Sequence, residues 1–378
     1  MQEKVSPGAW ICLIFSFISG FSTLFLQEAK LLEQDVWLSY LCGIAMSFGV
    51  LAVLYLAQRN YPGLSMTEVF DRLLGKQIAK ICLCLYLVYI LEIQGAAFQA
   101  LTLFYRTVVL PNTSSGQIIL LIALTTAYAS SLGLGAIVRT VQVLLCFFLF
   151  FMLVIVVFIY KNVTINPFLP LFQHRAPEIA FGGLLSLYFP FGKSIVFCFL
   201  FSRVTNRKKL LPSTLIALSL SGLYLFAATY LSFGSLGMNL VQSVTFPFFS
   251  AIQLVRFGEY LERIEIMIIG IWTVFTLFEI IVLQFVFMQV FEHIFALKHV
   301  RALALPVGLL FFAMSHRSFV HQADLSFYNF RIGPFSTLLP TVVIPLLLLL
   351  ISLLKRGNRS GEGGPLLASS DDARRPRS

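Results

Sequence analysis

The chain has 378 residues, of which 58% are hydrophobic and 12% are charged, and it carries a formal net charge of +10. That charged fraction is about half the roughly 25% of an ordinary globular protein, and a soluble fold cannot bury so many apolar side chains. This composition excludes a soluble enzyme and a secreted disulfide scaffold. It also excludes a nucleic-acid-binding module, because the positive charge is spread over short loops rather than gathered in one basic patch.

Long apolar runs recur from Gly8 to Leu354, and the mean hydropathy is +0.88. A helix needs about 20 such residues to cross about 30 Å of hydrocarbon. We therefore predict an all-α polytopic membrane protein with about ten transmembrane helices in one domain, residues 1–356. The predicted spans lie near residues 8–27, 38–57, 78–104, 117–132, 137–160, 179–202, 210–233, 264–291, 302–315 and 337–354.

Three segments outside these spans have their own character. For residues 59–77 we predict a cytoplasmic loop that contains a short amphipathic helix. Residues 240–263 are too apolar for a plain loop and too interrupted for a full span, so we expect an interfacial or re-entrant helix on the outer side. Residues 357–378 are rich in Gly, Ser, Pro and Arg, which predicts a disordered cytoplasmic tail.

The distribution of Lys and Arg predicts the orientation. Starting inside, 18 of the 27 fall on the cytoplasmic side, eight fall on the opposite side, and Lys193 alone lies within a span. Cytoplasmic loops carry an excess of Lys and Arg. The asymmetry therefore favours a multi-pass protein with both termini in the cytoplasm, and it supports an even number of spans.

Ten spans divide into two halves of five, near residues 8–160 and 179–354, and an odd number of helices per half makes the halves inverted. The first helix of each half carries helix-weakening residues in mid-span, at 19–23 in one and at 189–194 in the other. Proline lacks the N–H that continues a helix. We therefore expect two interrupted helices, whose free backbone groups suit a zwitterionic ligand such as an amino acid; kinked helices with no ligand are the alternative.

Charged residues within spans narrow the site further. Lys193 in mid-span costs about 2.5–3.5 kcal/mol on insertion scales, so it should face a cavity or a partner. Glu92 is also deep in its span. Lys193 and Glu92 allow three arrangements. They form an ion pair across the cavity, or a ligand binds Lys193 with its carboxylate while its ammonium faces Glu92, or the two charges simply neutralise each other. Glu279 is a third charged residue within a span, and this acid has no evident partner in the sequence.

Two stretches resemble a known family. The segment 257–266 (FGEYLERIEI), followed by 271–273 (IWT), resembles the entry to helix 8 in the permease-like B subunits of bacterial spore germinant receptors. The run 188–193 (YFPFGK) resembles that family's interrupted helix, and 20–25 (GFSTLF) fits its first helix. The likeness covers about residues 6–355 in length and helix count. The chain departs from it at Lys193, where a glutamate is expected, so an alanine-type specificity is not carried over.

The resemblance implies a leucine-transporter-type fold of the amino acid–polyamine–organocation superfamily, with a 5+5 inverted repeat, in the inner membrane of a spore. It implies that A-type and C-type receptor subunits are partners and that a small nutrient, amino acid-like, binds between two helix breaks. No cofactor and no metal are implied. The ligand-binding residues so implied are Gly20, Phe21, Ser22, Thr23, Glu92, Phe189, Phe191, Gly192 and Lys193.

Two functions share these features. One is a ligand-sensing receptor subunit that shifts between two arrangements on binding a nutrient. The other is a secondary transporter that moves an amino acid with Na⁺ or H⁺, and the fold does not decide between them. An integral-membrane enzyme is disfavoured because the sequence has no nucleophile–base or metal-binding constellation. Beyond the ligand and partner subunits, the lipid bilayer is the expected environment, and no nucleic acid is expected to bind.

Overall fold

The computed structural model describes residues 4–61, 63–160, 163, 168–254, 265–318 and 327–361. These ranges contain helices and a single isolated β-bridge, with no strand. The helices that build the bundle are α1 (Pro7–Phe25), α3 (Val36–Arg59), α5 (Lys76–Phe104), α6 (Ser115–Ser131), α7 (Leu134–Ile159), α8 (Ala176–Ser186), α9 (Arg207–Leu236), α12 (Glu265–Phe295), α13 (Ala304–Ser318) and α16 (Ile344–Gly361). Shorter elements join them: α2 (Gln27–Leu32), α4 (Met66–Leu74), α10 (Met238–Ser243), α11 (Pro247–Gln253) and α15 (Gly333–Ser336).

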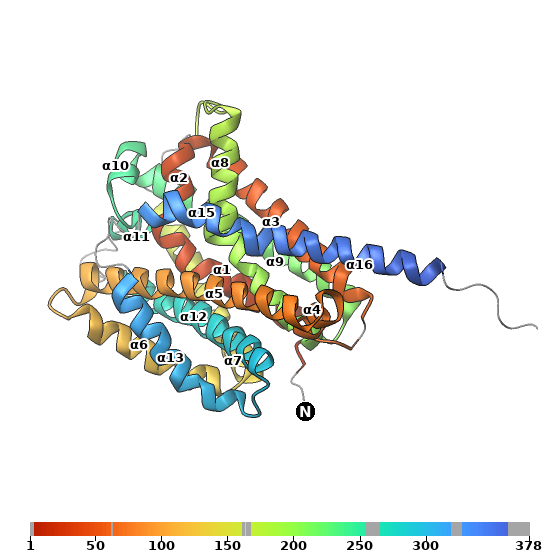
Figure 1. Cartoon of the computed structure of the whole chain (residues 1–378). Coiled ribbons are helices and arrows are strands. Elements are labelled where there is room, and N and C mark those ends of the chain that lie inside the picture. Colours follow the sequence, from red (N-terminus) through yellow and green to blue (C-terminus); the bar gives the residue numbers. More distant parts are fainter. Residues whose placement is uncertain are drawn as a thin grey trace, which may run out of the picture.

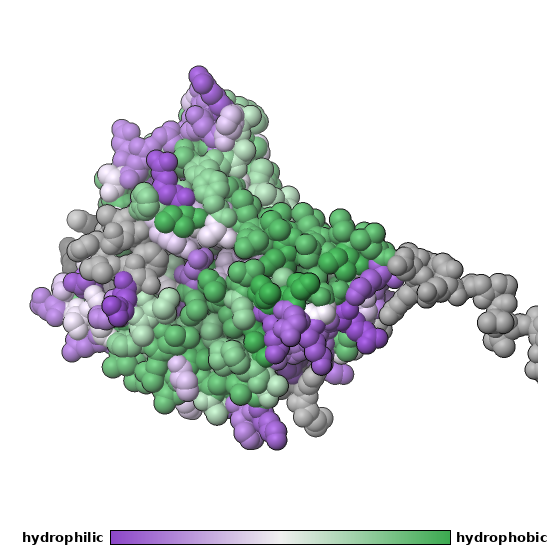
Figure 2. Space-filling view, in the orientation of Figure 1, coloured by the Kyte–Doolittle hydropathy of each residue, from purple (hydrophilic) through white to green (hydrophobic). Residues whose placement is uncertain are grey.

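The all-α membrane architecture predicted from the sequence is confirmed. Within the described ranges, seven helices are long and apolar enough to cross a membrane, and two shorter apolar helices cover Pro7–Gly20 and Ser115–Ser131. With α13, which is 15 residues long, these correspond to the ten predicted spans. Figure 2 shows hydrophobic residues over the sides of the bundle and hydrophilic residues at its tips, as expected where the sides face lipid.

Helix α1 lies at the centre of the bundle, where it packs against α7, α9 and α12 (Figure 1). Around it, α3 packs against α8 and α9, and α13 packs against α5 and α6. Gly20 sets the distance between α1 and α12, because a Cβ on this residue would lie 2.7 Å from the carbonyl carbon of Phe275. Helices α1 and α12 are therefore in backbone contact at this point.

The two ends of the bundle are closed by different contacts. At the end where α4 lies, which we call the α4 end, the amide of Val5 donates to the carbonyl of Arg203 (2.8 Å), and the amide of Thr205 donates to Val5 (3.0 Å). At the opposite end, which we call the α2 end, the ammonium of Lys30 donates to the carbonyl of Val244 (2.7 Å). These bonds hold the start of α1 and the end of α2 to segments almost 200 residues away or more.

The segments between spans are partly as expected. The amphipathic helix predicted within 59–77 is confirmed as α4, which begins with a capping box formed by Ser65 and Glu68. In place of one interfacial helix in 240–263, the structure has the short helices α10 and α11, and residues 255–264 lie outside the described residues. Helix α16 continues to Gly361, and the rest of the predicted tail lies outside the described residues.

Candidate functional site

The helix that follows α8 changes its backbone geometry where the sequence predicts an interruption. Helix α8 ends at Ser186, a π-helical turn (η4) covers Leu187–Phe191, and a 3₁₀ helix (η5) covers Gly192–Arg203. Pro190 within η4 has no N–H to donate to an α-helical bond. A Cβ on Gly192 would lie only 1.8 Å from the carbonyl oxygen of Leu187, so no side chain fits there. These two residues account for the interruption, and the prediction is confirmed.

Lys193, the first residue after this glycine, forms a buried ion pair with Glu279 of α12. The Lys193 ammonium donates to Glu279 Oε1 at 2.7 Å, and the two side chains are 2% and 1% exposed. The same ammonium lies 5.5 Å from the ring centre of Phe17 and 5.9 Å from that of Phe189, within the range of cation–π attraction. Glu279, which had no evident partner in the sequence, therefore has Lys193 as its partner.

The Lys193–Glu92 ion pair expected as one arrangement is wrong. Glu92 is half-buried on α5, and it accepts a hydrogen bond from the hydroxyl of Ser336 (3.2 Å) in α15. In η4, the hydroxyl of Tyr188 donates to Asn329 at 2.8 Å. Glu92 therefore contacts α15, whereas Lys193 pairs with Glu279 of α12.

The interruption expected at residues 19–23 is also wrong. Helix α1 continues through these residues and ends at Phe25, and the break follows at Leu26, which has a φ of 44°. Gly20 serves the close contact with α12, and the hydroxyl of Thr23 donates within the helix to Gly20 (3.2 Å). Gly20 and Thr23 thus contribute to packing and to a hydrogen bond within the helix, and α1 remains continuous through them.

The remaining predicted residues divide between two surroundings. Phe189 lies beside Lys193, whereas the ring of Phe191 packs against Tyr40 of α3, with ring centres 6.4 Å apart. Ser22 is buried on α1. Residue Phe21 lies in α1, and its side chain is outside the described residues. The structure therefore brings Lys193, Phe189 and the α1 face together, and it places Glu92 and Phe191 elsewhere.

Several buried polar atoms on α1, η5 and α12 have no hydrogen-bond partner. Among the described residues they include the hydroxyls of Ser19 and Ser22 on α1, Ser194 on η5 and Thr276 on α12, and the second carboxylate oxygen, Oε2, of Glu279. An unpaired buried polar group costs about 1–3 kcal/mol. So many such groups on the helices that carry or contact the ion pair indicate a place where water or a ligand completes the hydrogen bonding. We call the region formed by Lys193, Glu279 and these four hydroxyls the central site.

Glu28 is a further buried acid, and sequence reasoning missed its burial. It lies in the first turn of α2, its side chain is 2% exposed, and one of its carboxylate oxygens has no hydrogen-bond partner. Glu28 lies just past the first predicted span, and an acid at that position is expected in a solvated loop. The break at Leu26 leads into α2, which packs against α3 and α8, and Glu28 is buried there.

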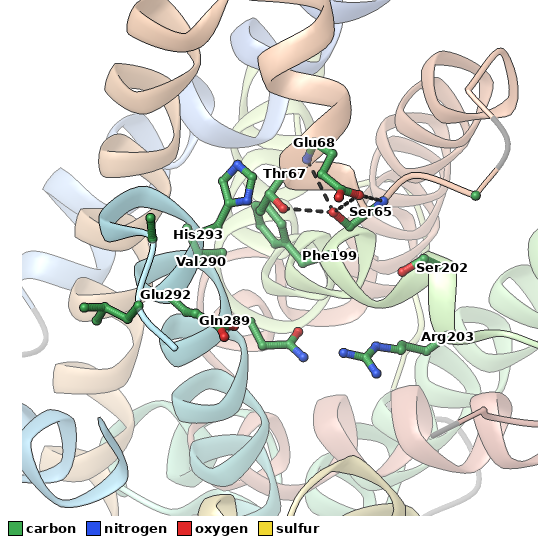
Figure 3. A pocket seen from close by; sticks show the side chains of 13 residues that line it. Ser65, Thr67, Glu68, Phe199, Ser202, Arg203, Gln289, Val290, Glu292 and His293 are labelled. Carbon is green, nitrogen blue, oxygen red and sulfur yellow. Dashed lines mark hydrogen bonds between the residues drawn. The ribbon is translucent and has the colours of Figure 1, made fainter. Parts of the chain in front are cut away.

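A separate polar cavity lies at the α4 end, with a volume of about 590 Å³ (Figure 3). Its walls come from α4 and the loop before it, from the end of η5, and from the end of α12. In Figure 3, Gln289 and Arg203 point toward one another across the opening. Phe199, which lines the cavity, follows Lys193 by six residues, or about 12 Å of 3₁₀ helix. A layer of buried side chains therefore separates the central site from this cavity.

Helix α4, which forms one wall of the cavity, is held against α12 by a partly exposed histidine–aspartate pair. The His293 Nε2 and Asp71 Oδ2 atoms lie 2.8 Å apart, and the side chains are 25% and 30% exposed. The ammonium of Lys355 donates to the carbonyl of Leu73 at 2.9 Å, at the end of α4. Together these contacts fix α4 against α12 and α16. The sequence did not predict this cavity, because its residues come from segments that lie far apart in the chain.

The comparisons with known proteins agree with this architecture. Residues 4–322 match the family described as "Spore germination protein". Spore germination protein KB of Bacillus subtilis (strain 168) is 22% identical over 376 residues, which cover 96% of this chain and 98% of that protein. Putative spore germination protein YfkT of the same strain is 22% identical over 335 residues, which cover 87% and 89% of the two chains.

A solved structure shows the same fold. The crystal structure of MhsT in complex with L-phenylalanine superposes with a TM-score of 0.64 and 14% sequence identity, and the match covers 94% of this chain and 90% of that one. At this identity the likeness establishes the fold alone. The chain has the leucine-transporter-type fold implied by the sequence resemblance.

Proposed function

This chain belongs to the spore germination protein family, and we propose that it is the membrane-embedded receptor subunit that binds a small nutrient and triggers germination. The family and the fold make it a multi-pass membrane protein of the germinant-receptor or transporter-like kind. The observation that carries the proposal is the Lys193–Glu279 pair, buried beside the interrupted helix among polar atoms that lack partners.

We place the ligand at the central site, between α1 and the junction of η4 with η5. A charged pair in a transmembrane region marks a functional site by default, because its burial is costly without one. The fold relative MhsT is complexed with L-phenylalanine, an amino acid, and this supports an amino acid-like nutrient as the ligand here. Binding of a nutrient at this site involves no covalent step. We therefore propose that the chain is a binding protein and not an enzyme.

The proposed mechanism is a shift between two arrangements of the bundle. A ligand biases such an equilibrium only by its differential affinity for the two states. The contacts that differ are those between the α1–α12 unit and the helix formed by η4 and η5, since the ligand lies between them. We propose that A-type and C-type receptor subunits read this change, in the inner membrane of the spore, with both termini of this chain in the cytoplasm.

An alternative is an amino acid secondary transporter coupled to Na⁺ or H⁺. The observation that favours it is the polar cavity of about 590 Å³ at the α4 end. The distribution of Lys and Arg favours the cytoplasmic side for that end. A cavity there, separated from the central site by one buried layer, suits a chain that releases solute inward.

Two experiments test the proposal. In the first, spores that lack the gene are exposed to single amino acids, sugars and nucleosides, and the gene is then restored. Loss of germination with one nutrient, regained on complementation, supports the receptor. In the second, the purified chain is reconstituted alone into vesicles. Concentrative uptake of labelled substrate there contradicts a pure receptor and supports the transporter.

A further inference from the structure

Glu92 is an acid in the middle of a membrane span, and among the described residues it forms no ion pair. It lies fourteen residues after Ile78, where the predicted span 78–104 begins. The hydroxyl of Ser336 donates to Glu92 Oε2 at 3.2 Å, and the same hydroxyl lies 3.1 Å from the carbonyl oxygen of Gly333. A hydroxyl has one proton to share between these two acceptors and carries no charge. Ser336 therefore does not neutralise the carboxylate.

Glu92 lies on the exposed side of α5. Ile78, Ile81, Leu85 and Val88 are 36–63% exposed, and they recur every three or four residues, which places them on one face of the helix. Glu92 continues this series four residues after Val88. At about 100° of rotation per residue, it falls in the middle of the arc that the four apolar residues cover. We call these five residues the α5 face.

A second apolar stripe runs along the neighbouring helix. Its members are exposed and lie three or four residues apart, from α15 through the π-helical turn η8 (Leu339–Val343) into α16: Phe335, Leu339, Val343, Leu346 and Leu350. The hydroxyl of Tyr86 on α5 donates to the carbonyl of Pro340 in η8 at 2.7 Å. The two stripes therefore lie on helices that are in contact, with Glu92 and Ser336 at the junction of α5 with α15 (Figure 1).

Lipid alone does not suit an ionised carboxylate at this depth, because hydrocarbon offers neither counter-charge nor hydrogen-bond donors. Lipid head groups stay about 15 Å away, at the surface of a hydrocarbon core about 30 Å thick. A second copy of this chain does not supply a cation either, since Lys193 is the one Lys or Arg in a predicted span and is buried against Glu279. Arg331, exposed on the helix before Ser336, makes no ion pair with Glu92 in the described part of the chain.

We propose that the α5 face, together with the stripe from α15 to α16, binds a transmembrane helix of another protein that places a Lys or Arg side chain beside Glu92. Charged residues within membrane spans pair with one another, and polar contacts hold membrane helices together. This surface is separate from the central site, so the assignment goes beyond the proposed function and applies to a receptor and a transporter alike.

Synthetic transmembrane helices test this chemistry on the full chain in phosphatidylcholine vesicles. The host peptide is a Leu–Ala helix of about 20 residues. One version carries Lys at its centre, a second carries Leu there, and a third carries the Lys two turns from the centre. Energy transfer between labelled chain and labelled peptide measures association. We expect the central-Lys peptide to bind about tenfold more tightly than the other two. Equal binding of the central-Lys and Leu peptides overturns the proposal, since Glu92 is then neutral or paired with Arg331.

The variant Glu92→Gln tests the residue itself. It keeps the shape of the side chain and removes its charge, so the preference for the central-Lys peptide should disappear. Glu178→Gln is the matched control, because this acid is exposed in the first turn of α8, and it should keep the full preference. Thermal unfolding confirms that both variants fold. If Glu92→Gln does not fold, Val88→Trp takes its place: it fills the α5 face, keeps the charge and should weaken binding of the central-Lys peptide. An unchanged preference in the folded variant overturns the proposal.

Crosslinking in the native membrane tests the partner. A photo-reactive residue is placed at Leu85 on the α5 face, and at Leu223 of α9, which is 64% exposed, as the control. We expect Leu85 alone to capture a membrane helix with a Lys or Arg in its span, and Glu92→Gln to abolish this product. Lipid adducts alone at Leu85, or a captured helix without a basic residue in its span, overturn the proposal. The germination assay is independent of these results, so the proposed function stands or falls separately.

Discussion

Two acid–base pairs in this protein have nearly the same geometry and opposite surroundings. Lys193 and Glu279 are 2.7 Å apart in the central site, with side chains 2% and 1% exposed. His293 and Asp71 are 2.8 Å apart beside the cavity at the α4 end, with side chains 25% and 30% exposed. The separation of the atoms therefore does not distinguish the pairs, whereas access to water does.

The difference determines what each pair contributes. Removing one partner of a buried pair leaves the other charge without water or counter-charge, and this costs about 3–5 kcal/mol. A pair in contact with water contributes about 0–1 kcal/mol, because solvent replaces most of the lost attraction. We therefore expect the buried pair to contribute more to the stability of the bundle than the partly exposed pair does. The predictions below test this contrast.

The largest effect is expected for Lys193→Met. The substitution keeps an extended apolar side chain and leaves Glu279 uncompensated, so the free energy of unfolding should fall by about 3–5 kcal/mol. Thermal or denaturant unfolding in nanodiscs measures it. Lys209→Met, at an exposed position of α9, is the control and should change little. Equal stability of the two variants would remove the distinction between the pairs.

The double variant Lys193→Met with Glu279→Leu sharpens the comparison. Replacing both members of a buried pair by apolar residues is often neutral or stabilising. We therefore expect the double variant to recover most of the stability that Lys193→Met loses, as measured by the same unfolding assay. A double variant that is less stable than the single one would mean that the pair is held by more than charge balance.

A smaller effect is expected for Gly192→Ala. Its Cβ would lie 1.8 Å from the Leu187 carbonyl oxygen, so η4 must shift and carry Lys193 with it. We expect a loss of about 1–3 kcal/mol in the free energy of unfolding, in the range of destabilising substitutions that strain a packed backbone. Gly49→Ala, whose Cβ meets nothing within 4 Å, is the helical control and should be neutral or slightly stabilising. A similar result for both glycines would contradict the account of η4.

The smallest effect is expected for His293→Ala. Water reaches both side chains of the pair, so the free energy of unfolding should fall by no more than about 1 kcal/mol. The unfolding assay at low and high salt checks it, with Lys209→Met again as the reference. A loss as large as that of Lys193→Met would show that α4 is a structural element of the bundle and not an adjustable wall of the cavity.

The sequence predicted features with local causes better than features that depend on packing. The interruption at Pro190 and Gly192 was predicted because a missing N–H and a missing side chain act on their own turn. The break expected near Gly20 was wrong, because that glycine serves contact with α12, more than 250 residues away. The partner of Lys193 lies 86 residues along the chain, and nothing in the local pattern distinguishes Glu279 from Glu92.

The positions of the buried acids show the same limit. Glu28 follows an apolar run, and the sequence places it at the membrane surface. Its burial depends on the turn at Leu26, where a non-glycine residue adopts a positive φ of 44°. The α4-end cavity likewise depends on how α4, η5 and α12 meet. The charge content and the number of helices were predictable from the sequence, but the burial of Glu28 was visible only in the folded chain.

The most direct test of the central claim is germination of gene-deleted spores complemented with either the wild type or the Lys193→Met, Glu279→Leu double variant. The double variant removes the polar pair and is expected to retain the fold, so its amount in the spore membrane is measured alongside. We predict that, at equal membrane levels, the wild type restores the nutrient response and the double variant does not. A double variant that restores the response at the same nutrient concentration would contradict the claim that the Lys193–Glu279 pair forms the ligand site.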